Sequence, residues 1–262
     1  MVHHFLTMEE VQSKVPSALA ETHDGRRSNR YNFVSSRQII ESMAANNWGL
    51  VSVAGPKTRT PARTQFGLHK MEFQARDSSP ITDPRRGAIY PRMIVMNSHN
   101  GTSNFSVHAG LLCMVCSNGL VVSAGSIGEF RVRHNNQFNI EDAFAAIQQF
   151  RENLTPIVGT IEQWDGVQLS NERAIEFATR AARIRWDNAQ DILPDYASLL
   201  QPRRQQDHGG SLWARYNVVQ ENLIRGGYSR NNRKVREMNQ IQEMMRVNRE
   251  LWDLGIEFAN NN

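Results

Sequence analysis

The sequence has 262 residues, of which 40% are hydrophobic, with a formal net charge of +4 and a pI near 9.3. This length and apolar content fit one large or two small globular domains and exclude a disordered chain. No window approaches 18 consecutive apolar residues, and the first residues lack the apolar core of a signal peptide, so we expect no membrane partner. Two cysteines exclude a disulfide framework, and we therefore expect a cytoplasmic location.

Two helices are predicted in the first fifty residues. Thr7 and the glutamate three residues later have the spacing of a capping box, which predicts a short helix that ends at Pro16. A second helix is predicted to start after Ser35 or Ser36, because apolar residues then recur on one side of the segment up to about residue 46.

The segment from residue 48 to residue 134 is predicted to be rich in β-strands. Residues 65–76 alternate in polarity as a half-buried strand does. Asn100-Gly101 has the sequence of a tight hairpin turn. Residues 57–63 are predicted to form a basic loop. The predicted strands are 50–54, 65–76, 93–96, 105–107, 120–122 and 129–134, and residues 109–115 fit either a helix or a strand.

Helical periodicity dominates after residue 139. Ser170 and Ser211 are suitable caps for two of the predicted helices, and Gly226 suits the end of the second. We expect an α+β fold, with an antiparallel sheet of hairpins in an N-terminal portion (1–138) and a helical C-terminal portion (139–262), packed as one domain. The predicted helices are 140–154, 170–185, 211–224 and 235–259.

The basic residues are unevenly distributed. Only four of the 30 are lysine, and arginine is better suited to bind carboxylates and phosphates through two parallel hydrogen bonds. Residues 57–92 hold eight basic and three acidic residues, and residues 200–236 hold eight basic and two acidic residues. Because the whole chain carries +4, the remainder carries −7. This asymmetry points to an acidic partner such as nucleic acid, although solvated loops also carry such charge.

Two segments combine cations with nearby aromatic residues, as single-strand binding requires. They are the basic loop at 57–63, with Trp48 close in sequence, and the connector at 224–236 with Tyr228. In the strand at 129–134, Arg131 and Arg133 fall on one face. The candidate nucleic-acid-binding residues are Arg59, Arg63, Lys70, Arg131, Arg133, Arg225, Tyr228, Arg230, Arg233, Lys234 and Arg236.

The sequence contains no nucleotide-binding or hydrolase motif, so we expect neither a cofactor nor a metal, and a binding protein is favoured over an enzyme. Cys113 and Cys116 form a CxxC pair that could hold zinc with nearby histidines, but small buried thiols explain the pair as well. An enzyme site built from Asn97, His99, Cys116 and Asn118 is an alternative. Turn hydrogen bonding by the asparagine side chains also accounts for those positions.

Several blocks of the sequence are shared with one family. They are YNFV (31–34), SHNGTS (98–103), AGLLCMVCSNGLVV (109–122), FRVRH (130–134), WARYNVVQENLIRGG (213–227) and NRELW (248–252). Together they resemble the phage/plasmid-like proteins of the "domain of unknown function 932" family, over about residues 29–258. The resemblance implies an accessory protein carried by phages and plasmids, and it assigns no catalytic residue.

The leading expectation is a phage or plasmid protein that binds nucleic acid in the host cytoplasm, in particular single-stranded DNA during replication or recombination. The order of elements is also loosely similar to that of single-strand annealing proteins, which act as homo-oligomers. The alternatives are a phage protein that inhibits a host defence or replication factor, and an uncharacterised enzyme.

Overall fold

The computed structural model describes most of the chain. The described residues are 4–27, 31–56, 58–77, 81–83, 87–113, 119–121, 130–132, 155–186, 196–226, 229–230 and 233–261. The chain divides into two compact units, each of which is described below by itself. Unit 1 comprises residues 1–80, 90–111 and 124–153, and unit 2 comprises residues 81–89, 112–123 and 154–262.

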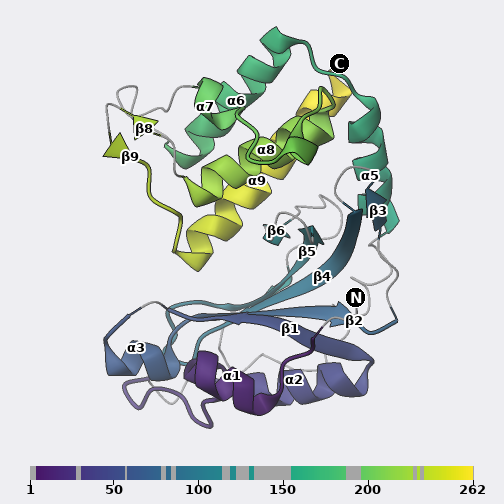
Figure 1. Cartoon of the computed structure of the whole chain (residues 1–262). Coiled ribbons are helices and arrows are strands. Elements are labelled where there is room, and N and C mark those ends of the chain that lie inside the picture. Colours follow the sequence, from purple (N-terminus) through teal and green to yellow (C-terminus); the bar gives the residue numbers. More distant parts are fainter. Residues whose placement is uncertain are drawn as a thin grey trace. The chain divides into compact units, whose positions relative to one another are not determined.

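Unit 1 is a β-sheet with helices packed on one face (Figure 1). The elements of this unit are α1 (Met8–Lys14), a 3-10 turn at Pro16–Leu19, α2 (Ser36–Ala45), β1 (Trp48–Ala54), α3 (Pro61–Phe66), β2 (His69–Ala75), β4 (Gly87–Asn97, in this unit from Tyr90), β5 (Phe105–Cys113, in this unit to Leu111) and β7 (Phe130–Val132). Within this unit the strands follow the order β1-β2-β4-β5, with β7 beside β5.

The core of unit 1 lies between the sheet and its helices. In β2, Met71 and Phe73 face this core, and β2 pairs with β4 so that Met71 lies opposite Val95 and Phe73 opposite Met93. These four side chains are completely buried. Because successive strand residues point to opposite faces, Lys70 and Glu72 lie on the other face of the sheet.

Local sequence signals account for several of these elements. The Thr7 side chain accepts a hydrogen bond from the backbone N–H of Glu10, and the Glu10 carboxylate accepts one from Thr7, which confirms the predicted capping box. The Ser35 side chain caps α2 by accepting a hydrogen bond from the backbone N–H of Gln38. The prediction of a loop at residues 57–63 running into a strand at 65 was wrong, because α3 occupies Pro61–Phe66. Pro61 stands at the first helical position, where its missing N–H has no hydrogen-bonding cost.

Unit 2 is mainly helical. Ser170 and Ser211 cap α6 and α8 as predicted. The helix predicted over residues 140–154 lies outside the described residues. The elements of this unit are β3 (Ile81–Asp83), β6 (Gly119–Val121), α5 (Thr155–Gly166), α6 (Asn171–Arg185), α7 (Tyr196–Leu199), a 3-10 turn at Gln205–Asp207, α8 (Leu212–Arg225), β8 (Ser229–Arg230), β9 (Arg233–Lys234) and α9 (Ile241–Asn260).

Helix α8 forms the centre of unit 2, since every residue from Leu212 to Ile224 except Arg215 is buried. Aromatic rings pack around it. The ring centroids of Trp164 and Trp252 lie 4.5 Å apart, and those of Trp164 and Tyr216 lie 5.1 Å apart. A Cβ at Gly255 would overlap the Trp164 indole, so this glycine lets α9 approach the aromatic cluster closely.

The α+β fold is confirmed: antiparallel strand pairs dominate the N-terminal half, and helices dominate the C-terminal half. The last helix begins later than predicted, at Ile241 instead of residue 235. Upstream of it, residues 235–240 form neither helix nor strand, and the backbone N–H of Met238 donates to the carbonyl oxygen of Ile224. In the part of the chain that the structure describes, no helix has the length and apolar character needed to cross a membrane.

Candidate functional site

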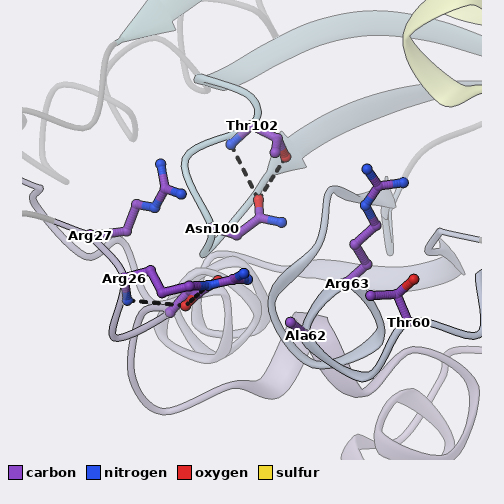
Figure 2. Close-up of a pocket in the computed structure, with 8 residues that line it drawn as sticks. Arg26, Arg27, Thr60, Ala62, Arg63, Asn100 and Thr102 are labelled. Atoms are coloured by element: carbon purple, nitrogen blue, oxygen red, sulfur yellow. Dashed lines mark hydrogen bonds and ion pairs between the residues drawn. The ribbon is translucent and has the colours of Figure 1, made fainter.

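Unit 1 contains a pocket between three segments of the chain (Figure 2). These segments are the loop at 24–27, the start of α3 at 60–63 and the turn at 100–102. The pocket has a volume of about 490 Å³, which is within the range of small-molecule and cofactor sites. Its lining residues are Asp24, Arg26, Arg27, Thr60, Ala62, Arg63, Asn100 and Thr102.

The backbone of His99 holds the three walls of the pocket together. Its N–H donates to the carbonyl oxygen of Phe66, at the end of α3, over 2.9 Å. Its carbonyl oxygen accepts from the backbone N–H of Asp24, also over 2.9 Å. His99 itself precedes the turn at 100–102. The spacing of the walls is therefore set by main-chain hydrogen bonds among segments that are far apart in the sequence.

The turn wall is further fixed by its own polar side chains. The Asn100 Oδ1 atom accepts from the backbone N–H of Thr102 at 3.2 Å and from its hydroxyl at 2.6 Å. Below the turn, the Ser98 hydroxyl donates to the carbonyl oxygen of Ser103 and accepts from its N–H. Gly101 has a φ of +66°, a left-handed conformation that glycine adopts without steric cost. The predicted Asn-Gly turn is thus confirmed.

The electrostatics of the pocket favour an anion. The Asp24 carboxylate accepts hydrogen bonds from the side chain and the backbone N–H of Arg26, and these hold its pKa down, at about 2. The only carboxylate in the lining is therefore ionised and already neutralised by Arg26. Among the described residues, no ion pair is formed by Arg27 or Arg63, which line the same pocket.

Arg27 lies directly against the turn. A Cβ at Gly101 would lie 3.2 Å from both the Cδ and the Nη1 atom of Arg27, and 3.6 Å from the Tyr31 ring. The Tyr31 hydroxyl donates to the carbonyl oxygen of Ser98 at 2.6 Å. The bare glycine therefore makes room for the guanidinium at the edge of the pocket.

A buried polar network supports this end of the sheet. The His69 Nδ1–H donates to the carbonyl oxygen of Gly67, so that Nε2 accepts from the Ser36 hydroxyl at 2.8 Å. The amide of Asn97 donates to Ser36 and to the carbonyl oxygen of Val34, and its Oδ1 accepts from the next backbone N–H. Ser36, His69 and Asn97 are all 0% exposed. They connect α2, β2 and β4, and a substrate has no access to them.

The predicted residues of the first basic segment are placed differently from one another. Arg63 lines the pocket, and Arg59 is exposed just before it in the chain. Lys70 lies on the opposite face of β2 from the core, and its Nζ donates to the Glu72 carboxylate at 2.6 Å. For Arg131 the backbone alone is described, opposite Ser106 in β5. Arg133 lies outside the described residues.

In the second basic segment, several arginines bind groups of the protein itself. Arg204 donates two hydrogen bonds to Glu221, and the Arg225 Nε atom lies 3.5 Å from the same carboxylate. Arg203 donates to the Asn222 side chain and to the carbonyl oxygen of Gly226, and thereby caps the end of α8. These arginines stabilise helix α8.

The structure describes the rest of this segment only in part. Arg236 is exposed, and its carbonyl oxygen accepts from Arg185 at 2.7 Å. The backbone pairs Arg230 with Arg233 and Ser229 with Lys234 in β8 and β9. Tyr228 lies outside the described residues. Trp48, considered as a partner for base stacking, is only 1% exposed and belongs to the core, so that interpretation was wrong.

Potential metal ligands do not cluster in the part of the chain that the structure describes. Among the described residues, no group of three histidine, cysteine or acidic side chains is arranged to hold an ion. Cys113 ends β5, whereas Cys116 and Asn118 lie outside the described residues. Of the alternative enzyme site, the structure thus describes only Asn97 and His99, which are both fully buried.

Comparison with known proteins shows the family to which the chain belongs. The sequence model described as "Domain of unknown function (DUF932)" matches residues 24–252. The chain belongs to this family. Two curated relatives from Escherichia coli (strain K12), the UPF0380 proteins YfjQ and YafZ, are each 31% identical over 258 residues, covering 94% of this chain and 89% of the relative. No solved structure matches the chain.

The DUF932 match confirms the family that the sequence blocks indicated. All three walls of the pocket fall within the matched residues, which begin at Asp24. Sequence reasoning missed Arg26 and Arg27, because their loop at 21–30 also carries Glu21 and Asp24 and so has no strong excess of charge. Two consecutive arginines after a glycine were the available signal.

Proposed function

We propose that this DUF932 protein binds single-stranded nucleic acid and that the arginine-lined pocket of unit 1 holds its phosphates. The observation that carries the proposal is the ion pair between Arg26 and Asp24 in the pocket. Because Arg26 neutralises Asp24, the positive charges of Arg27 and Arg63 can bind a ligand. Arginine binds phosphate oxygens through two parallel N–H groups and is suited to this task.

The size and composition of the pocket support the same conclusion. A volume of about 490 Å³ admits a phosphate with part of its sugar or base. The exposed Arg59 lies one residue before the pocket wall at Thr60. It would extend the cationic surface along a strand whose phosphate occupies the pocket.

The biological setting belongs to this proposal as well. The resemblance to phage/plasmid-like proteins favours a role with single-stranded DNA in the replication or recombination of a mobile element, in the host cytoplasm. Oligomer formation would suit an annealing role, and light scattering with and without oligonucleotide would test it.

Fluorescence anisotropy with a labelled 20-nucleotide single strand tests the binding function, at about 50 mM and 150 mM salt. We expect binding at micromolar protein and a slope of log K against log salt that becomes less steep by about 0.7 in the Arg63→Gln variant. Arg180→Gln is the matched control, since it removes the same charge from an exposed ion pair with Glu257 on unit 2. Lack of binding by the wild-type protein at low salt would refute the proposal.

A further inference from the structure

We propose that the pocket selects the phosphate monoester at the end of a nucleic acid strand in preference to the diesters within it. This inference rests on the proposed nucleic-acid-binding function and adds the part of the strand that the site takes. Three features of the pocket carry it: its net charge, the hydrogen-bonding character of its walls, and the fixed spacing of the three segments that line it.

The charge of the pocket matches a dianion. Three guanidinium groups and one carboxylate line it, a net of +2, and the carboxylate is fully ionised because its pKa lies at about 2. A phosphodiester within a strand carries a single negative charge. A terminal phosphate monoester carries about −1.5 to −2 at pH 7, so only the terminal group neutralises both of the remaining cations.

The walls present hydrogen-bond donors to the interior. The backbone N–H of Thr102 can only donate, which identifies the atom of Asn100 that it contacts as Oδ1. The amide nitrogen of Asn100 is consequently turned away from Thr102, on the side of Arg63, as Figure 2 shows. Arg27 and Arg63 are donors without acceptor capacity. A phosphate monoester offers three terminal oxygens as acceptors, whereas a diester offers two.

The pocket is bounded on separate sides by different segments. Arg26 and Arg27 come from the 24–27 loop, Arg63 from α3, and Asn100 from the turn (Figure 2). The backbone hydrogen bonds of His99 fix the spacing of these segments, and with it the spacing of the two cations that a dianion would neutralise.

The test compares three single-stranded 12-nucleotide ligands of one sequence, with a 5′-phosphate, a 3′-phosphate or hydroxyls at both ends, each labelled at the end without the phosphate. A 13-nucleotide ligand with two hydroxyl ends controls for one additional diester charge. We expect one phosphorylated ligand to bind at least about tenfold more tightly than the 13-nucleotide ligand. An RNA version and a free nucleoside monophosphate as competitor distinguish the source of the monoester.

Two variants test whether the pocket arginines cause the preference for a phosphorylated strand end. Arg63→Gln should abolish the preference for the phosphorylated end, and Arg27→Gln should do the same. Arg59→Gln, which removes an equal charge beside the pocket, should weaken all ligands to a similar extent and keep the preference. A thermal melt of each variant verifies that the fold is retained.

The outcomes separate this inference from the proposed function. Equal affinity for phosphorylated and hydroxyl ends, with binding still reduced by Arg63→Gln, would overturn the end-selective inference and leave the binding function standing. A preference that survives in both pocket variants would also overturn it, because the end would then be held elsewhere. No binding of any ligand would refute the binding function itself, and with it this inference.

Discussion

The two terminal nitrogens of Arg204 donate to the two carboxylate oxygens of Glu221, at 2.8 Å and 2.7 Å, although the residues lie 17 positions apart. The Glu221 side chain is only 3% exposed. Arg204 thus acts as the principal counter-ion of a carboxylate inside unit 2. Part of the high arginine content of the C-terminal segment is explained by this internal role.

We predict that Arg204→Leu destabilises the protein by about 3 kcal/mol, because it leaves Glu221 buried with only the more distant Arg225 as a cation. Urea unfolding followed by circular dichroism measures this loss. Arg180→Leu is the control, since its pair with Glu257 is exposed on both sides and should be worth less than about 1 kcal/mol. Equal losses in the two variants would contradict the buried role of Arg204.

The ion pair of Asp24 and Arg26 makes the stability of unit 1 depend on pH, with a loss of stability at low pH. Hydrogen bonds from Arg26 lower the Asp24 pKa from 3.8 to about 2 in the folded protein. The carboxylate therefore stabilises the fold fully above the pKa of the unfolded chain, and this contribution disappears as the pH falls towards 2. We expect Asp24→Asn to lower Tm at pH 7 and to lower it much less at pH 2. A difference in Tm that does not change with pH would contradict this linkage.

The positive φ of Gly101 provides a test of the turn wall. Gly101→Ala forces an L residue into a left-handed conformation and places a Cβ 3.2 Å from Arg27. We expect a loss of about 1 to 2 kcal/mol in stability together with weaker oligonucleotide binding. Gly25→Ala is the matched control in the neighbouring wall, where a Cβ has no atom within 4 Å. If both variants bind equally well, the turn does not position Arg27.

Gly226 is the corresponding test in unit 2. Its φ of +60° and ψ of −139° are restricted to glycine, and a Cβ there would lie 2.5 Å from the carbonyl oxygen of Val235. We expect Gly226→Ala to cost at least about 2 kcal/mol in the free energy of unfolding. Gly166→Ala, at the end of α5 with no atom within 4 Å of the added Cβ, should be neutral or slightly stabilising. Thermal melts of the two variants would reveal the contrast.

The sequence allowed good predictions where the physical cause is local. Ser170 and the apolar periodicity after it predicted the helix at 171–185, and the Asn-Gly pair predicted the turn that now forms a pocket wall. A cap or a tight turn depends on groups within about four residues, so a linear pattern contains it. The helix at 61–66 was missed because its strongest signal, Pro61, also fits a loop.

Of the residues that line the candidate site, the sequence predicted only Arg63, because the site depends on distant segments. Arg27, Arg63 and Asn100 come together only after the sheet forms and the His99 backbone joins their segments. Of the two basic segments, residues 200–236 have the larger net positive charge in the sequence. That charge could not show that Arg203 and Arg204 bind the protein's own polar groups, because partner choice by a long flexible side chain is settled by tertiary structure.

The hydrogen bonds of the His99 backbone have a consequence for how such a pocket could diverge. Every residue has a backbone carbonyl, and every residue except proline has an N–H, so the frame does not depend on the chemistry of the side chains that line it. Arg27, Arg63 and Thr60 could be exchanged for residues of other charge or size while the walls kept their spacing. The main-chain frame of the pocket is therefore independent of the ligand that the side chains select.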